Sequence, residues 1–445
     1  MALNSILNSR CRESEQRWLD QMRRIFEKAE VDEMKKEVDA CVFEVPKSTS
    51  AFKPEAYTPQ LIGLGPYHHF RPELYQMQWF KIAAAKGFLK SDQILNFQHL
   101  IINQLEELEL TIRACYNKYL DLDYSTLAWI DGLFLLHFLC NQDGFAGNKL
   151  KMDATTRDIM MLENQIPVNL LKRIWRTLKL SLHDDDDNEL LTRFCKIHSP
   201  LALSLNPRYE LDADPVHLLD LMYHLIINKR AQKPRKKAAQ KRMKMAEVST
   251  MEVMGNVGQI IDIGIPGAEV IQKPVKVIQN LPWDKICGLV GKQKLQGNNS
   301  GTTEGETPQV EEINIPSVSE LFKVAKIKFS PTPRQGGIRD IEFNEKELTF
   351  YLPVITLNVN SEVILRNLVA YEALSGSTLE LGGYVDLMSG IIDAAEDARL
   401  LREMGIIIGS DYLMTDEEIA QLFNRINKST GKAHEESELE KNIYW

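Results

Sequence analysis

Apolar residues recur every three or four positions along most of the chain, which is the spacing of amphipathic helices. The first such stretch lies within residues 1–40, where Trp18, Met22 and Phe26 stand among charged residues. Residues 74–225 then carry a series of apolar stripes at the same spacing. The pattern predicts an N-terminal amphipathic helix over 1–40 and a helical core over 41–228.

Prolines interrupt the pattern between the first helix and the core. Residues 43–73 contain five of them: Pro46, Pro54, Pro59, Pro66 and Pro72. Each proline removes a backbone donor and restricts the residue before it. We therefore expect an extended segment that wraps around the core.

The pattern changes again after residue 313. Ser317 and Glu320 form a capping box that predicts a helix start. Alternating apolar residues between 338 and 359 predict two or three short strands, one of them kept to an edge by Pro353. Helices are predicted to follow over 361–374 and 384–404, and a last one after the capping box of Thr415 and Glu418.

The predicted fold class is therefore predominantly α with a minor β part (α+β). It is a multi-helix globular core with a small antiparallel β element near 338–359 and a large inserted loop. Residues 313–430 continue the domain begun by 41–228, and residues 431–445 form a tail. A chain of 445 residues exceeds the size of one hydrophobic core, which agrees with two lobes or a large insertion.

The insertion is expected over 229–312, where the composition becomes basic and then polar. Its first sixteen positions, 229–244, hold nine Lys and Arg residues. The spacing fits a bipartite nuclear import signal, but an inert solvated linker explains it equally well, and contact with anionic lipid or nucleic acid is a third interpretation. The residues of the candidate signal are Lys229, Arg230, Lys241, Arg242 and Lys244.

Charge and cysteine usage narrow the class of protein. A net charge of −9 disfavours general nucleic-acid binding, and no specific nucleic-acid motif is present. The six cysteines lie far apart in the sequence, which is typical of a reducing compartment. The acidic run Asp184–Asp187 is predicted to be a solvated loop between two helices.

No targeting or membrane segment is evident in the sequence. The N-terminus lacks the pattern of a signal peptide. The strongest apolar run, Leu127–Cys140, is shorter than the roughly 20 residues that a membrane span needs, and it contains Asp131 and His137. We expect a soluble protein that is cytoplasmic, nuclear or both.

Four segments carry a resemblance to a known family, which is named below. The first ends in Gly-Pro-Tyr-His-His, and the second is Trp129-Ile-Asp-Gly-Leu-Phe. The third runs from Arg157 to Pro167, and the fourth from Arg366 to Glu372. Their candidate residues are Gly65, Pro66, Tyr67, His68, Asp131, Gly132, Glu163, Asn164, Gln165, Pro167, Arg366, Asn367 and Glu372.

Two of these segments have both a structural and a chemical interpretation. Pro167 forces Ile166 out of helical conformation, and the side chains of Glu163, Asn164 and Gln165 can satisfy the backbone groups left open. Alternatively, Glu163 has a binding or catalytic role. The two imidazoles after Tyr67 suit acid–base chemistry, but no nucleophile or orienting third group accompanies them, which favours structural docking.

Cofactor and metal sites are not predicted. His137 with Cys140, and His217 with His224, are only pairs, whereas a metal needs three or four ligands. No phosphate-binding loop or nucleophile elbow is present. Gly382-Gly383 could approach an anion through its backbone amides, although a turn is the commoner role.

The four segments, in this order, resemble the plant domain of unknown function family 247, also called uncharacterised protein family 0481. The resemblance covers roughly residues 40–428 apart from the insertion. It implies a plant protein without an agreed enzymatic activity, and some grass members are implicated in self-incompatibility recognition. Members typically end in a transmembrane helix that this sequence does not contain, so membrane attachment is expected only if the native chain is longer.

Three functional hypotheses follow. The first is a non-enzymatic recognition protein with a protein partner, of the kind that the self-incompatibility members represent, which presents exposed loops such as the insertion. The second is an enzyme with a pocket near His68 and Glu163. The third is a nuclear regulatory protein imported through residues 229–244.

Overall fold

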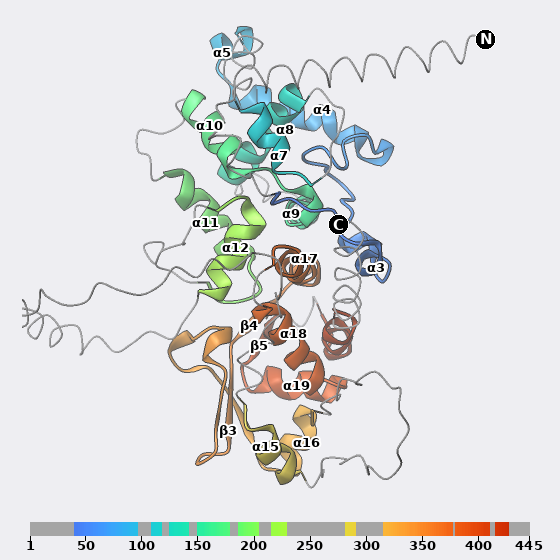
Figure 1. Cartoon of the computed structure of the whole chain (residues 1–445), viewed down its shortest axis with the longest axis vertical. Helices are drawn as coiled ribbons and strands as arrows, with labels where there is room; N and C mark the ends of the chain where they lie inside the picture. Colours follow the sequence, from blue (N-terminus) through green and yellow to red (C-terminus); the bar gives the residue numbers. More distant parts are fainter. Residues whose placement is uncertain are drawn as a thin grey trace, which may run out of the picture.

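The computed structural model describes residues 40–96, 108–117, 124–141, 149–178, 186–203, 215–228, 281–290, 315–376, 379–409 and 414–426. Within these ranges the chain is predominantly helical with a few short strands, which confirms the predicted fold class. Figure 1 shows an elongated arrangement, with the helices of the first half at one end and the strands and last helices at the other. The predicted N-terminal helix, the nuclear import signal and the tail lie outside the described residues.

Helix α8 (Tyr124–Cys140) is the centre of the first half. It is apolar all round, and side chains such as Trp129, Phe134 and Phe138 are fully buried. Such a helix is stable only when neighbours cover every face. Its covering helices are α4 (Tyr75–Phe88), α7 (Glu109–Ala114), α10 (Val168–Leu178) and α11 (Asp186–His198).

Three other helices complete this half: α5 (Ser91–Leu95), α9 (Lys149–Ile159) and α12 (Leu218–Ile227). Helix α11 begins at Asp186, so the second half of the acidic run is not the loop that we predicted.

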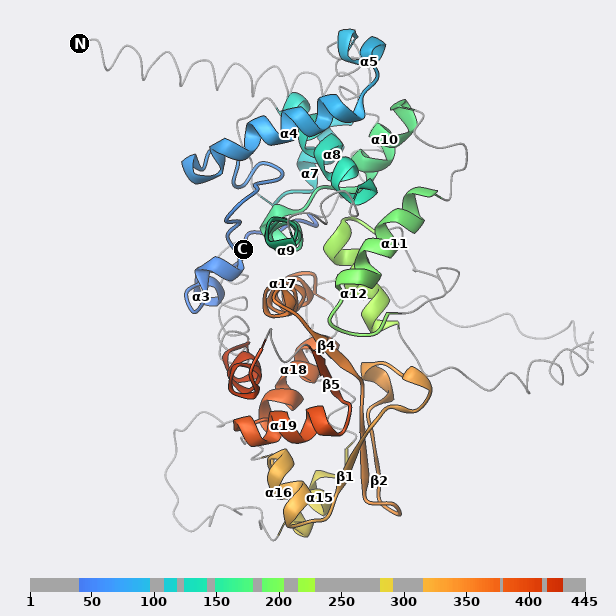
Figure 2. The ribbon, with the colours of Figure 1, turned by 180° about the vertical axis from the view of Figure 1, so that it is seen from behind.

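The proline-rich segment before α4 contains only single helical turns, as its composition predicts. They are α3 (Lys47–Ser50), η1 (Pro54–Ala56) and η2 (Pro72–Leu74). The extended stretch between η1 and η2 crosses the first half and places residues 60–65 beside the end of α9 (Figure 2). This path brings the first and third motif segments into contact.

The second half contains two small sheets. Strands β1 (Lys328–Pro331), β2 (Glu342–Asn344) and β3 (Thr349–Leu352) form one sheet, in the order β1-β3-β2. The β2–β3 pair is antiparallel, as predicted, whereas β1 pairs with β3 in parallel. Strands β4 (Ile355–Leu357) and β5 (Ile407–Gly409) form a separate parallel pair.

Helices surround these sheets. The Ser317–Glu320 capping box opens α16 (Val318–Lys323), as predicted. A helix over 416–426 follows Thr415, whose backbone N–H and hydroxyl both donate to Glu418, so this capping box is confirmed as well. A further short helix, α15 (Trp283–Leu289), lies inside the segment predicted to be the insertion, with Ile286 fully buried.

The single helix predicted over 384–404 is wrong. The chain forms α18 (Glu380–Ile391) and α19 (Ala395–Glu403) with a break between them. Asp397 explains the break, because its carboxylate accepts hydrogen bonds from the backbone N–H groups of Asp393 (3.0 Å) and Ala394 (2.9 Å). A side chain that caps α19 in this way competes with continuation of the preceding helix.

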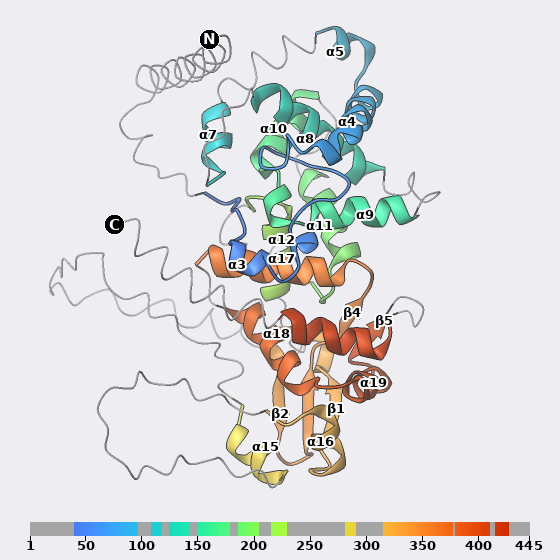
Figure 3. The same ribbon diagram turned by 90° about the vertical axis from the view of Figure 1, so that its right-hand side faces the viewer.

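Helix α17 (Ser361–Leu374) joins the two halves. It contacts α12, η1 and η4 (Leu162–Asn164) on the side of the first half and α18 on the other. Figure 3 shows it lying between the two groups of helices. Its residues are buried from Val363 to Glu372, including the charged and amide side chains of the fourth motif segment. The motif is thus at the centre of the molecule.

Candidate functional site

The first motif segment is held by the carboxylate of Asp158, at the end of α9. Its Oδ2 atom accepts the backbone N–H groups of Gln60 (3.0 Å), Leu61 (2.5 Å) and Ile62 (2.9 Å). Its Oδ1 atom accepts from the guanidinium of Arg157. Burial raises the pKa of Asp158, and the hydrogen bond from Ile62 and the charge of Arg157 oppose that shift. The carboxylate therefore acts as a clamp for an extended backbone.

Asn164 continues this clamp one turn further along the chain. Its Oδ1 atom accepts the N–H of Leu64 (2.6 Å), and its Nδ2 atom donates to the carbonyls of Ile62 and Asp158 (both 2.9 Å). Both hydrogens of the amide are used. Asn164 is 1% exposed, so these bonds replace all solvation of the side chain.

Gln165 satisfies the helix end before it. Its Nε2 atom donates to the carbonyls of Ile159 and Met161 (both 2.7 Å), which the end of α9 leaves open. Its Oε1 atom accepts the N–H of Leu219 at the start of α12 (3.0 Å). The amide thus fixes how α9 and α12 meet, and Pro167 precedes α10 directly.

Asp131, in the middle of α8, holds the turn at Gly65. Its Oδ2 atom accepts the N–H of Gly65 (2.9 Å). Its Oδ1 atom lies 2.5 Å from the ammonium of Lys81, which also donates to the carbonyl of Gly63 (2.8 Å). Asp131 and Lys81 are both completely buried. Burial raises the pKa of Asp131, and the charge of Lys81 opposes that shift.

Two motif glycines are explained by close approach. Gly65 has a positive φ of 65°, and an added Cβ would lie 3.0 Å from the hydroxyl of Tyr116. At Gly132 a Cβ would come within 2.4 Å of the Cδ1 atom of Ile174, so the glycine lets α10 approach α8. Both positions serve packing.

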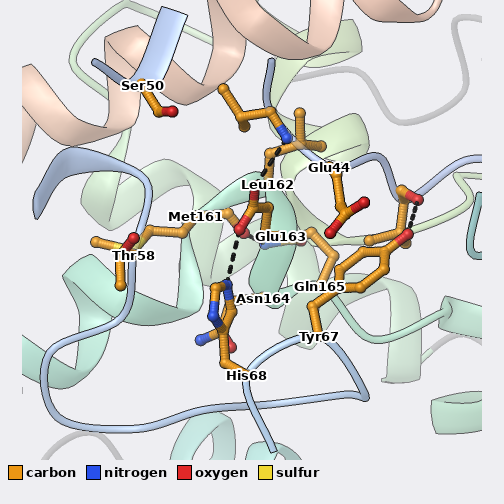
Figure 4. Close-up of polar contacts among 12 residues, drawn as sticks. Glu44, Ser50, Thr58, Tyr67, His68, Met161, Leu162, Glu163, Asn164 and Gln165 are labelled. Atoms are coloured by element: carbon orange, nitrogen blue, oxygen red, sulfur yellow. Dashed lines mark hydrogen bonds and ion pairs between the residues drawn. The ribbon is translucent and has the colours of Figure 1, made fainter. Parts of the chain in front are cut away.

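Glu163 differs from its neighbours because it is in contact with an imidazole (Figure 4). Its Oε1 atom accepts the N–H of Val45 (2.7 Å), and its Oε2 atom lies 2.9 Å from Nε2 of His68. The latter contact has the length of an ion pair, but its angle is not that of a hydrogen bond. The carboxylate retains 16% exposure, while the imidazole has 6%.

Tyr67 and His69 do not join this pair. The hydroxyl of Tyr67 donates to Oδ1 of Asn117 (2.6 Å) and lies 2.9 Å from the carbonyl of Val42. Burial raises the pKa of Tyr67. The ring of His69 contacts Phe70, and burial lowers its pKa. The adjacent imidazoles of His68 and His69 therefore lie in different surroundings.

The fourth segment binds backbone groups from two distant parts of the chain and from its own helix. Asn367 accepts the N–H of Leu162 (2.9 Å) and donates to the carbonyls of Ala56 and Val363 (both 2.8 Å). Arg366 donates to Glu362, which also pairs with Lys53. These contacts attach α17 to the wrapped segment and to η4.

Glu372 holds the start of α18. Its Oε1 atom accepts the hydroxyl of Tyr223 and the N–H of Leu381 (both 2.9 Å), and its Oε2 atom accepts the N–H of Gly382 (2.7 Å). Burial raises the pKa of Glu372 to about 6. The N–H groups of Leu381 and Gly382 therefore bind this carboxylate, whereas that of Gly383 donates to the carbonyl of Leu379 (3.2 Å), within a helix rather than in the predicted turn.

The histidine pairs that we considered as metal ligands have other partners. Nδ1 of His217 accepts the N–H of Asp220 (3.0 Å), and its Nε2 atom donates to the carbonyl of Cys41 (2.9 Å). His224 contacts the carboxylate of Asp220. Among the described residues, no group of three or more His, Cys, Asp or Glu side chains could hold a metal ion.

The arrangement brings together most of the predicted site residues, but as hydrogen-bonded joints between segments. Lys81 and Asp158 were missed as candidates, although both lie inside or near the motif segments. Each could have been recognised as a single charged residue on an otherwise buried helical face, because a buried charge is stable only when it is paired. That partner cannot be read from local sequence.

Comparison with known proteins identifies the family of the chain. The sequence profile of the family described as plant protein of unknown function (DUF247) matches residues 42–444. The chain belongs to this family. It is 34% identical to the Arabidopsis thaliana UPF0481 protein At3g02645, over 93% of this chain and 83% of that protein. A second Arabidopsis thaliana UPF0481 protein, At3g47200, is 20% identical over 87% of this chain and 72% of that protein.

No solved structure matches the chain significantly. Across the part of this DUF247 protein that the structure describes, no helix is both long and apolar enough to cross a bilayer.

Proposed function

We propose that this DUF247 protein is a non-enzymatic recognition protein that binds a protein partner. One observation supports the proposal most: the buried polar side chains of the family motifs are used by internal backbone bonds. Asp131, Asp158, Asn164, Gln165 and Glu372 each accept hydrogen bonds from main-chain N–H groups of other segments. Side chains whose hydrogen-bonding groups are used within the fold stabilise the scaffold. They retain few donors or acceptors for binding a substrate.

A second observation supplies a surface for the partner. Three large aromatic side chains project from α4 and the turn before it: Phe70, Tyr75 and Trp79 are 76%, 65% and 69% exposed. The opposite face of α4, with Met77 and Ala84, packs on α8. Figure 2 shows α4 on the outer side of the first half. We call Phe70, Tyr75 and Trp79 the aromatic face.

The composition of the aromatic face fits a protein interface. Tyr, Trp and Arg are the residues most enriched at interface hot spots, and exposed Arg71 borders the face. The exposed charges from 71 to 90 are Arg71, Glu73, Lys86 and Lys90, an excess of positive charge. The partner that we propose therefore presents apolar side chains flanked by acidic ones.

This proposal is tested with the full-length chain expressed in plant tissue. We replace Tyr75 and Trp79 with Ser, and use Phe52→Ser as the matched control, since Phe52 is also exposed, at 48%, but lies next to α3. Zero-length carbodiimide cross-linking, which joins Lys to Asp or Glu, is followed by mass spectrometry. We expect the double variant to lose at least about 30-fold of the recovered partner, and Lys86 or Lys90 to be joined to acidic partner residues.

Two outcomes would reject the proposal. One is equal partner recovery by the double variant, the control and the unmodified chain. The other is cross-links that map only to regions away from α4. Thermal melting of the purified variants checks that both substitutions leave the fold intact.

The contact between His68 and Glu163 supports the enzyme as a second candidate. It joins an acid and a base, and Glu163 is the most exposed of the three consecutive polar motif residues. Nuclear import through residues 229–244 lies outside the described residues and stays a prediction. Localising the chain with Lys241, Arg242 and Lys244 replaced by Ala tests it, and an unchanged nuclear signal would remove it.

A further inference from the structure

Two cysteines that are far apart in the sequence are neighbours in space. Cys41 stands at the start of the wrapped segment and Cys115 at the end of α7. The carbonyl of Cys115 accepts the N–H groups of Cys41 (2.9 Å) and Val42 (2.8 Å). Val42 and Tyr116 form a parallel β-bridge. Each cysteine directly precedes a residue of this bridge, so the two backbones lie side by side at these positions.

The spacing of such a pair suits a disulfide. Bridged strands lie about 4.8 Å apart, which is inside the window of about 4.4–6.8 Å between the Cα atoms of disulfide-bonded cysteines. The thiols are also in contact: Cys41 is hydrogen-bonded to Cys115, and the Sγ atom of Cys115 lies 3.3 Å from the carbonyl of Thr111. Both cysteines are free.

We propose that Cys41 and Cys115 form a reversible disulfide when the protein meets a peroxide or a disulfide oxidant. The bond ties the first strand of the wrapped segment to the end of α7. It closes a loop that contains the Gly-Pro-Tyr-His-His segment, α4 and the aromatic face.

The surroundings assign different roles to the two sulfur atoms. The hydrogen bond from Cys41 lowers the pKa of Cys115, whereas the same bond and burial raise that of Cys41. Cys115 is therefore the attacking thiolate. With hydrogen peroxide, its sulfur attacks one oxygen, the O–O bond breaks, hydroxide leaves, and a sulfenic acid forms on Cys115.

Cys41 completes the reaction. Its sulfur attacks the sulfur of Cys115, the S–O bond breaks, an S–S bond forms, and water leaves. In total two thiols lose two hydrogen atoms, and one peroxide is reduced to two water molecules.

The exposure of Cys41 and Cys115 to solvent differs from that of Cys195, which is deeply buried. Cys41 is 9% exposed and Cys115 is 7% exposed, whereas Cys195 is 0% exposed and contacts the carbonyl of Leu218. Cys41 and Cys115 therefore each retain some exposure to solvent, and to a small oxidant dissolved in it. Cys195 is thus an internal control that should remain a thiol.

The test oxidises the purified full-length chain with hydrogen peroxide, blocks the remaining thiols, and maps peptides without reduction. We expect a linked peptide that contains Cys41 and Cys115, an unmodified Cys195, and reversal by dithiothreitol. The link should raise the melting temperature by several degrees, because it restricts the unfolded chain.

Two variants keep the test decisive. Cys41→Ser should leave a sulfenic acid on Cys115 that dimedone traps, and oxidation should then leave the melting temperature unchanged. Cys140→Ser, which removes an exposed cysteine, should not alter the link. The proposal is overturned if Cys41 and Cys115 stay unlinked while Cys140 is oxidised, or if the link forms only in urea.

Discussion

Asp131 and Glu372 hold backbone in the two halves of the molecule, but with different partners. Both carboxylates are completely buried and accept main-chain N–H groups of a neighbouring segment. Asp131 faces the buried ammonium of Lys81, whereas the bonds to Glu372 come from Tyr223 and the start of α18. The comparison teaches that a buried carboxylate can hold main-chain N–H groups either beside a cation, which opposes the rise of its pKa, or with neutral donors alone.

Removal of Lys81 should have the largest effect. Lys81→Met leaves Asp131 as a buried carboxylate without its cation, and breaking a buried pair from one side costs about 3–5 kcal/mol of unfolding free energy. Urea denaturation followed by circular dichroism measures the loss. Lys86→Met is the matched control, because Lys86 lies on the exposed side of the same helix and should change stability by less than about 0.5 kcal/mol. Equal losses would refute the pairing.

The second prediction concerns the pH dependence at Glu372. Burial raises its pKa from 4.5 to about 6, so the folded state holds the proton more tightly than the unfolded state does. The contribution of this group to stability is therefore fully present below pH 4.5, and it falls as the pH rises through about 6. The fall is about 2 kcal/mol at 1.4 kcal/mol per pKa unit.

Glu372→Gln removes this titration and keeps the shape of the side chain. Urea midpoints measured from pH 4 to 7 should show a smaller decline for Glu372→Gln than for the unmodified chain, whatever the offset between the two curves. Parallel curves would show that Glu372 does not titrate in this range. Lys81→Met, measured in parallel, tests how far the cation limits the pH dependence of the Asp131 joint.

The smallest effect is expected at Glu163, the partly exposed carboxylate. Glu163→Gln keeps an acceptor for the N–H of Val45 and loses only the charge opposite His68, so we expect a destabilisation of about 1 kcal/mol or less. The same variant tests whether the His68–Glu163 pair belongs to the interaction surface, because recovery of the protein partner should not change if the pair lies outside it. A stable Glu163→Gln protein that fails to bind would place this pair in the interaction surface.

The sequence predicted elements whose signals are local. Ser361–Leu374 is helical over the predicted bounds, and the Ser317–Glu320 box opens α16, because periodicity and capping act within a few residues. Strands β1 and β5 escaped prediction, since each is a short segment that pairs in parallel with a distant partner. The break at Asp397 was missed because the apolar period continues across it.

The sequence predicted most of the polar residues of the candidate site, but it did not predict which of them contact each other. The motif segments single out Asp131, Glu163 and Asn367 as polar residues at structurally demanding places. Lys81 with Asp131, His68 with Glu163, and Cys41 with Cys115 are brought together by tertiary structure over long separations. No local pattern encodes these partners.

The hydrogen bonds of Asn367 determine when the first half of the protein can be completed during synthesis. Its amide serves Leu162, which is 205 positions earlier, and Ala56, which is 311 positions earlier. At about 5–20 residues per second, a ribosome needs roughly 10–40 seconds to travel from Leu162 to Asn367. Throughout that interval the nascent first half lacks the amide that completes it, and the surface that α17 covers stays open until α17 emerges.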